Sequence, residues 1–304
     1  MGKLIIREAR PSDRKAVVSF SAKIWEGHDY LPRVWDQWLE EPFGALLVAE
    51  LDGRTVGTNK VTVLAPGEVW LEGLRVDPLQ QSKGIAWALN QRAMEIVKKL
   101  KPATVRFSTV FDNQASRHMG EQGGFRFLFP CRRLLAQSKK GDLPREAQGG
   151  MEDVDKILAL LEKSSNFRQM KGLFAWGWIF KTLDRPFVER VVAEGGALVA
   201  RSLGKISGLA LFLKQRHGPK AALGVIDGDD RTITALAGQF RIAAERLGFR
   251  ELISMVPESS APLLLAAGFR LEEPTRVVVY ELSGETLERA VRVGGDITIP
   301  GSWE

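Results

Sequence analysis

Apolar and polar residues alternate along the first half of the chain in a pattern that predicts both strands and amphipathic helices. Alternating runs predict strands at 3–9, 68–76, 103–110 and 125–135, and a hairpin at 45–64 that turns at Asp52–Gly53. Apolar residues at helical spacing predict helices at 31–40, 84–100 and 113–122, and one that begins at a Ser12 or Asp13 cap. This order of elements indicates an α/β fold in which helices cover both faces of a mixed sheet.

The pattern of the first half returns in the second. The segment Leu47–Ala49 recurs as Leu198–Ala200, an offset of 151 residues, and two glycines follow each copy at the same spacing. The segment Gly124–Arg126 recurs as Gly268–Arg270, each time after a helical stretch. Between the copies, the polar stretch 138–150 has little to bury and is expected to be a linker. We therefore expect two tandem domains, at 1–137 and 151–304.

Composition and charge narrow the class of protein. Of the 304 residues, 44% are apolar and 26% are charged, which is typical of a globular chain. The 43 basic and 37 acidic residues leave a net charge of +6 that is spread along the sequence, so no nucleic-acid partner is expected. Cys131 is the only cysteine, and the three histidines are scattered, so neither an internal disulfide nor a metal site is expected.

The sequence also bears on location. No apolar run approaches the roughly 18 residues of a membrane span, and residues 1–8 resemble neither a signal peptide nor a myristoylation signal. We therefore expect no membrane association. A single cysteine favours the reducing cytoplasm.

The most specific feature is the polar loop between the strand at 68–76 and the helix that follows it. This loop and the helix start consist of Gln81, Ser82, Lys83, Gly84, Ile85 and Ala86. The first turn of a helix offers unsatisfied amide groups and the positive end of its dipole, and small residues leave room for a phosphate. The pattern predicts an anion site, although a tight turn that serves only helix packing would use the same small residues.

The order Gln81, two residues, Gly84, one residue, Ala86 resembles the acyl-CoA signature of the GNAT acyltransferase superfamily. The strand before it ends in Val76-Asp77-Pro78, as such strands commonly do, and Asn113 followed by Gly124-Phe125 is similar to a later helix of that family. The resemblance covers roughly residues 3–135, and the second half is similar to a degenerate copy of the same fold. Residues 27–32 and 69–76 are also similar to the animal histidine N-acetyltransferases.

The resemblance implies acetyl-CoA as the cosubstrate and assigns residues to it. In that family a bulged strand pairs with the pantetheine arm, which implicates the main chain of Leu74, Arg75 and Val76. An N–H near Leu74 would stabilise the oxyanion. The pyrophosphate would lie on the amides from Ser82 to Ala86. Asn113 would contact the cofactor arm, or would simply cap its helix.

Transfer to an amine also requires proton transfer, because an amine is mostly protonated at pH 7. Glu72 stands where many family members have a catalytic Glu, and its alternative role is a salt bridge. The family's usual acid, a tyrosine, is replaced here by Gly120. Water, or Tyr30 in its place, is then expected to protonate the leaving thiolate. His118 is expected to face outward.

The acceptor site is expected near the second helix of the first half. Trp25, Glu26, Asp29 and Tyr30 cluster where this fold usually binds the acceptor, and the two acids would attract a cationic amine. The nearby Trp35 and Trp38 are expected in the core instead.

The second copy lacks the loop. Its corresponding stretch contains Asp227, Asp229 and Asp230, whose charges oppose a pyrophosphate, so this half is expected to bind no cofactor.

The predicted function is direct transfer of an acetyl group from acetyl-CoA to the amine of a small molecule or amino acid. One alternative is a non-catalytic acyl-CoA-binding sensor, which the missing tyrosine suggests. Another is an aminoacyl-tRNA-dependent transferase, a role of other tandem copies of this fold. The sequence leaves the acceptor, the preferred acyl chain and the oligomeric state open.

Overall fold

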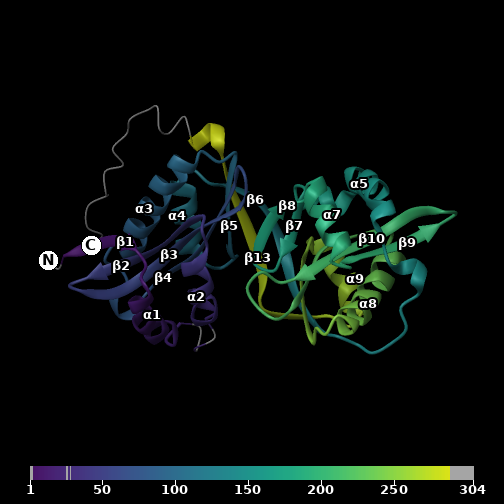
Figure 1. Cartoon of the computed structure of the whole chain (residues 1–304), viewed down its shortest axis with the longest axis horizontal. Helices are drawn as coiled ribbons and strands as arrows, with labels where there is room; N and C mark the ends of the chain where they lie inside the picture. The colour runs from purple at the N-terminus through teal and green to yellow at the C-terminus, as the bar shows by residue number, and fades with distance from the viewer. Residues whose placement is uncertain (1–2, 25–26, 28, 288–304) are drawn as a thin grey trace. The chain divides into compact units, whose positions relative to one another are not determined.

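The computed structural model describes residues 3–24, 27 and 29–287 (Figure 1). Its strands are β1 (Leu4–Glu8), β2 (Gly44–Leu51), β3 (Arg54–Ala65), β4 (Glu68–Val76), β5 (Thr104–Val110), β6 (Arg126–Gln137), β7 (Leu173–Trp176), β8 (Ile179–Thr182), β9 (Ala197–Ser202), β10 (Lys205–Lys214), β11 (Ala221–Asp227), β12 (Glu251–Val256) and β13 (Arg270–Ser283). Its α-helices are α1 (Arg14–Ser21), α2 (Leu31–Glu40), α3 (Ile85–Leu100), α4 (Gln114–Gln122), α5 (Val154–Lys163), α6 (Ser165–Gln169), α7 (Arg185–Ala193), α8 (Asp230–Arg246) and α9 (Ala261–Ala266). The expected α/β class and the elements of the first half are confirmed.

The sheet is mixed, with strand order β1-β2-β3-β4-β5-β13-β6-β12-β11-β10-β9, and β7 and β8 form a separate two-stranded sheet. The chain forms two compact units. Unit 1 contains residues 1–106, 119–126 and 281–304, and unit 2 contains residues 107–118 and 127–280. Each unit therefore draws on separate stretches of the sequence. The division into domains at a linker over 138–150 stays a prediction.

In unit 1, antiparallel pairing joins β1, β2, β3 and β4. The hairpin between β2 and β3 turns at Asp52 and Gly53, whose φ angles of 49° and 77° are those of a tight hairpin turn. Helices α1 and α2 cover one face of these strands and α3 covers the other (Figure 1). Trp35 and Trp38 of α2 are 0% and 1% exposed in the core beneath it, as expected.

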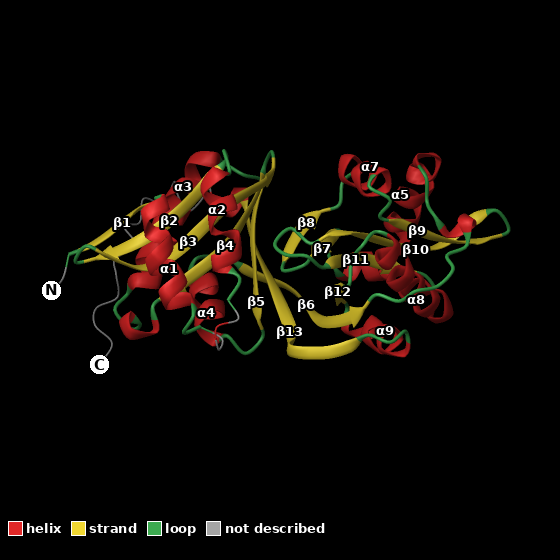
Figure 2. Cartoon of the chain, turned by 60° about the horizontal axis from the view of Figure 1, so that its bottom comes forward, coloured by secondary structure: helices red, strands yellow, loops and turns green. Residues whose placement is uncertain are grey.

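Unit 2 repeats this layering. Helices α5 and α7 pack on one side of β10, and α8 packs against β9, β10 and β11 (Figure 2). The core under α8 contains Leu236, Ala237 and Phe240, each no more than 1% exposed. The β7–β8 hairpin packs against β11 and has no counterpart among the described elements of unit 1.

The repeat extends to the start of each copy, which the sequence comparison missed. The amide of Ala9 donates to Leu46 O at 2.8 Å, and the amide of Gly149 donates to Ala197 O at 3.0 Å. Four residues later in each copy, Asp13 or Asp153 ends a short 3₁₀ turn and forms an ion pair with an arginine. The offset here is 140 residues, not 151, because the second copy has eleven more residues before its hairpin. A change of offset conceals such a repeat from a search at constant spacing.

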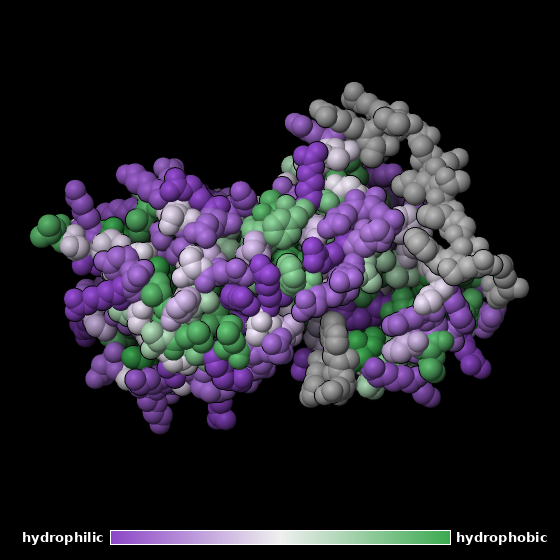
Figure 3. Space-filling model, turned by 180° about the vertical axis from the view of Figure 1, so that it is seen from behind, coloured by the Kyte–Doolittle hydropathy of each residue, from purple (hydrophilic) through white to green (hydrophobic). Residues whose placement is uncertain are grey.

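Most of the surface seen in Figure 3 is hydrophilic, with apolar residues in small, separate areas. Within the described part of the chain, no helix combines the length and the apolar character needed to cross a membrane.

Candidate functional site

A β-bulge interrupts β4 directly before the polar loop. Thr58 of β3 pairs with Arg75 and Lys60 pairs with Glu72, so the single residue between the pairs on β3 faces two residues on β4. One of those two is Gly73, whose φ is +69°. A Cβ atom there would lie 2.7 Å from the Trp38 ring, so only glycine fits both the backbone and the neighbour. The bulge expected from the family resemblance is therefore present.

The bulge places two charged side chains of β4 on one face of the sheet. Residues three apart on a regular strand point to opposite faces, because side chains alternate. Here Glu72 pairs with Lys60, and Arg75 pairs with Thr58. Lys60 and Thr58 lie two apart on β3 and share a face, so the side chains of Glu72 and Arg75 also share it. This is the face covered by α2. The sequence pattern alone predicts the opposite placement.

Glu72 is held by a neighbouring hydroxyl. The Oγ1 atom of Thr62 donates to Glu72 Oε1 at 2.6 Å, and Thr62 is 1% exposed. On the same face, Lys60 is 1% exposed and its Nζ lies 2.9 Å from Glu41 Oε2. Each of these polar groups has a charged or hydrogen-bonding neighbour, as burial requires. Thr62, Lys60 and Glu41 lie at the candidate site although the sequence did not single them out, because each belongs to an otherwise ordinary strand or helix end.

Asp29 lies differently from the acid expected at the mouth of an acceptor pocket. Its carboxylate is 1% exposed, with Oδ2 2.9 Å from Nε of Arg75, and Oδ1 accepts the amide of Leu31 at the start of α2. The Arg75 guanidinium is 15% exposed and also donates to the carbonyl of Leu74. Asp29 therefore orients Arg75, and any part it has in acceptor binding is indirect.

Tyr30 joins these groups. The Arg75 guanidinium carbon lies 5.7 Å from the Tyr30 ring centre, and Trp38 meets the ring edge-on. Burial and the negative charge of Glu72 raise the pKa of Tyr30, so its hydroxyl keeps its proton at neutral pH. The structure thus brings the two expected catalytic residues, Glu72 and Tyr30, into one cluster.

The loop before α3 leaves the helix start open. Ser82 and Gly84 have φ angles of 62° and 71°, and Lys83 donates to Gln80 at 2.8 Å. Gly84 occupies the N-cap position, and in this fully described segment no side chain caps α3. Loop residues 81–84 are exposed, whereas Ile85 is 2% exposed and anchors the helix. The amides of the first turn of α3 are therefore available to an anion.

Asn113 caps α4, since its Oδ1 accepts the amide of Ser116 at 3.1 Å. This is the structural role considered for it, and the contact with the cofactor arm stays a prediction. Gly120, at the position of the missing tyrosine, is buried, and His118 is exposed as expected. Trp25 and Glu26, also expected at the acceptor site, lie outside the described residues.

The second copy has the opposite arrangement at its helix start. Asp229 caps α8 by accepting the amide of Thr232 at 2.7 Å. Hydrogen bonds from the side chain and then the amide of Thr232 lower the pKa of Asp229. Its carboxylate therefore occupies a position that a phosphate would need. The absence of a cofactor from the second copy stays a prediction.

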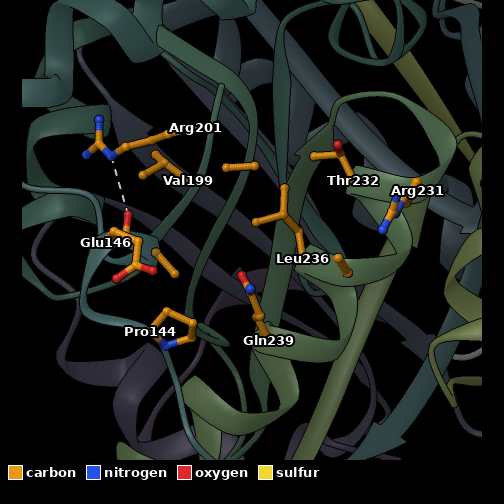
Figure 4. Close-up of a pocket in the computed structure, with 11 residues that line it drawn as sticks. Pro144, Glu146, Val199, Arg201, Arg231, Thr232, Leu236 and Gln239 are labelled. Atoms are coloured by element: carbon orange, nitrogen blue, oxygen red, sulfur yellow. Dashed lines mark hydrogen bonds between the residues drawn. The ribbon is translucent and has the colours of Figure 1, made fainter. Parts of the chain in front are cut away.

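Unit 2 does contain a cavity of about 300 Å³, between the segment 144–147, β9 and α8 (Figure 4). Arg201 on its rim is bound to Asp153 and donates to the Glu146 carbonyl, so it holds this segment against the unit. None of the expected site residues lines this cavity.

Comparison with known proteins bears on the same segment. Residues 14–125 match the model of the acetyltransferase (GNAT) family. The human protein named Probable N-acetyltransferase 16 is 28% identical over 187 residues, which are 60% of this chain and 48% of that protein. Histidine N-acetyltransferase of Scomber australasicus is 35% identical over 95 residues, which are 31% of this chain and 28% of that protein. The chain thus spans half or less of the length of these curated relatives.

Two solved structures have the same fold over almost the whole chain. A GCN5-related N-acetyltransferase from Sphaerobacter thermophilus superposes with a TM-score of 0.65 at 18% identity, covering 92% of this chain and 96% of that one. A tandem GNAT protein from the clavulanic acid biosynthesis pathway superposes with a TM-score of 0.55 at 15% identity, covering 93% and 99%. At such identities the likeness concerns the fold. The match to the acetyltransferase (GNAT) family concerns residues 14–125, within a fold that these structures share.

Proposed function

We propose that this chain is an acetyl-CoA-dependent N-acetyltransferase that passes the acetyl group directly to the amine of a small molecule or amino acid. The observation that carries the proposal is the uncapped start of α3 beside a bulged strand that carries Glu72, inside the segment that matches the family. An open anion site next to a carboxylate supplies both a place for a phosphate-bearing donor and a base.

In this proposal the residues divide the work between binding and proton transfer. The motif from Gln81 to Ala86 holds the pyrophosphate, and the main chain of Leu74–Val76 pairs with the pantetheine arm. An amide near Leu74 stabilises the oxyanion. Glu72 removes the amine proton, and a water molecule or Tyr30 protonates the departing thiolate.

The acceptor is proposed on narrower grounds. The partial similarity to histidine N-acetyltransferase covers 31% of this chain and suggests an amino acid. Trp25, Glu26, Asp29 and Tyr30 are the proposed acceptor-site residues, with Asp29 acting through Arg75. The cytoplasm remains the proposed location, in keeping with the single cysteine.

The donor site can be tested by a matched pair of variants. Gly84 has φ +71°, which Asn and Asp tolerate better than other side chains, and an added Cβ meets nothing within 4 Å. Gly84→Asp should lower acetyl-CoA affinity on the order of 100-fold by charge repulsion, whereas Gly84→Asn should change it far less. Calorimetry measures both. Equal affinities for the two folded variants would exclude the pyrophosphate from this helix start.

The sensor is the second candidate, because the buried Gly120 supplies no hydroxyl at the usual position of the acid. Release of CoA thiol with a panel of amines separates the two functions. Cys131 adds little background in this assay, since it is buried and burial raises its pKa. Binding of acetyl-CoA without turnover of any amine would favour the sensor.

A further inference from the structure

We propose that Arg75 binds the carboxylate of the acceptor, and that the acceptor is therefore a free α-amino acid whose amine meets Glu72. This inference rests on the proposed acetyltransfer and names its substrate class. It begins from the bulge in β4, which brings the Arg75 guanidinium and the Glu72 carboxylate to one face of the sheet.

The spacing of the two groups suits a small zwitterion. Their pairing partners Thr58 and Lys60 are two residues apart on β3, so the two strand positions are separated by about 7 Å. In an α-amino acid one carbon atom joins the ammonium group to the carboxylate. The side chains of Glu72 and Arg75 can thus reach the two ends of one molecule. A polyamine, or the side chain of a protein lysine, presents no carboxylate beside its amine.

In the Asp29–Arg75 ion pair the arginine is more exposed than the acid. Of its two side chains, Asp29 is 1% exposed and Arg75 is 15% exposed, so an incoming ligand meets the guanidinium. Asp29 accepts from Nε, and the Leu74 carbonyl accepts from Nη1 at 2.9 Å, which together fix the plane of the guanidinium. A planar, oriented guanidinium is the side chain best suited to bind a carboxylate.

Tyr30 completes the arrangement. Its ring lies 5.7 Å from the Arg75 guanidinium carbon and stands edge-on to Trp38. The ring packs on the apolar cluster that contains Leu31 and Trp38, and apolar surroundings strengthen the electrostatic contact of a guanidinium with a ligand.

The test compares a free amino acid with its amide, which has the same side chain and no carboxylate. The amine of the amide loses its proton more readily, so amine basicity cannot cause a preference for the acid. For the full chain with acetyl-CoA, kcat/KM measured by thiol release should be 10-fold to 100-fold higher for the acid, mainly through KM. Equal or faster turnover of the amide would overturn the proposal.

Variants then assign the preference to Arg75. Arg75→Gln alone would leave a buried carboxylate unpaired, so it is combined with Asp29→Asn. The double variant should lose the 10-fold to 100-fold preference for the acid, so that kcat/KM becomes similar for the acid and the amide. Arg33→Gln, which removes an exposed guanidinium from α2, should retain the preference. If the double variant is folded but still prefers the acid, Arg75 is not the carboxylate site.

A direct binding experiment separates this proposal from the acetyltransfer on which it rests. The amino acid and its amide are titrated by calorimetry into the protein loaded with CoA. Tighter binding of the acid, lost in the double variant, supports the carboxylate site even if no acceptor is acetylated. If amides and simple amines are acetylated as fast as amino acids, the chain is an acetyltransferase but Arg75 is not a carboxylate site.

Discussion

Two strand pairs of the same topology have opposite chemistry in the two copies. In unit 1, β3 and β4 carry Lys60, Thr62, Glu72 and Arg75 on the face under α2. In unit 2, stretches 208–213 of β10 and 221–226 of β11 contain only glycine and apolar residues, and β11 has a bulge at Gly224. Asp227 pairs with Leu209 there, as Arg75 pairs with Thr58 in unit 1. A Cβ on Gly224 would collide with the Phe174 ring, much as one on Gly73 would meet Trp38. The second copy therefore keeps the fold with one carboxylate, Asp227, in place of these four polar side chains.

The difference shows which charges the architecture itself requires. Buried ionic groups cost free energy unless they are paired, and apolar residues of similar volume are often as good for stability or better. At its bulge, unit 2 has glycine and apolar residues in place of such ionic groups. The polar cluster of unit 1 is therefore best explained by chemistry, and the uncapped α3 and self-capped α8 repeat the same contrast at the helix starts.

Glu72→Gln makes the bulge of unit 1 more like that of unit 2, and it should have the largest effect. If Glu72 is the base, kcat at neutral pH should fall on the order of 100-fold, and activity should recover as the pH approaches the pKa of the amine itself. Acetyl-CoA affinity, measured by calorimetry, should hardly change. The control Asp230→Asn alters an exposed carboxylate of unit 2 and should have no effect. If Glu72→Gln leaves the rates unchanged at every pH, the Glu72 carboxylate has a structural role and is not the base.

Asp13 and Asp153 test what the copies share. Hydrogen bonds from Arg201 lower the pKa of Asp153. In Asp13, bonds from Arg7 and Thr55 outweigh burial and also lower its pKa. A lowered pKa contributes stability that is present above the unfolded value near 4 and is lost as the pH falls through the folded value.

Asp153→Asn should therefore reduce the free energy of unfolding at pH 7 by about 2 kcal/mol, and by much less at pH 3. Arg201 is 29% exposed, which keeps the loss below that of a fully buried pair. Denaturant unfolding at the two pH values measures this loss of stability. Asp13→Asn should show the same dependence on pH as Asp153→Asn. A loss of equal size at both pH values would indicate a packing effect.

Thr62→Val should give the smallest effect, because it removes one hydrogen bond to Glu72 and keeps the shape of the side chain. We expect kcat/KM to fall about 10-fold. The acidic limb of its pH profile should move to higher pH, because the ionised carboxylate loses a donor. Thr62→Ser keeps the hydroxyl and should restore both. A uniform fall in rate with an unshifted profile would mean that Thr62 serves only packing.

The fold could be predicted in most of its elements because the signals are local. The β2–β3 turn at Asp52–Gly53, the helices α2 and α3 and the Asp229 cap all follow from residues within a few positions of one another. Register and strand order depend on pairings between distant segments. The place of β13 between β5 and β6 is an example that no local pattern reveals.

The candidate site divides in the same way. The motif from Gln81 to Ala86 could be recognised because its proposed function depends on consecutive backbone amides. The burial of Asp29 could not be predicted, since it depends on Arg75, which lies 46 residues away. Thr62 and Lys60 gave no signal, because a Thr or Lys on a strand is ordinary until its neighbour on the next strand is known.

The sequence by itself determined the α/β class, the repeat, the open helix start of the first copy and the self-capped start of the second. Each of these depends on spacing along one short segment. Only the tertiary structure decided that Glu72 and Arg75 share a face, because one additional residue in β4 reverses the alternation of every side chain beyond it. The same bulge needs Gly73 beneath Trp38, a contact between two elements that lie 35 residues apart in the sequence.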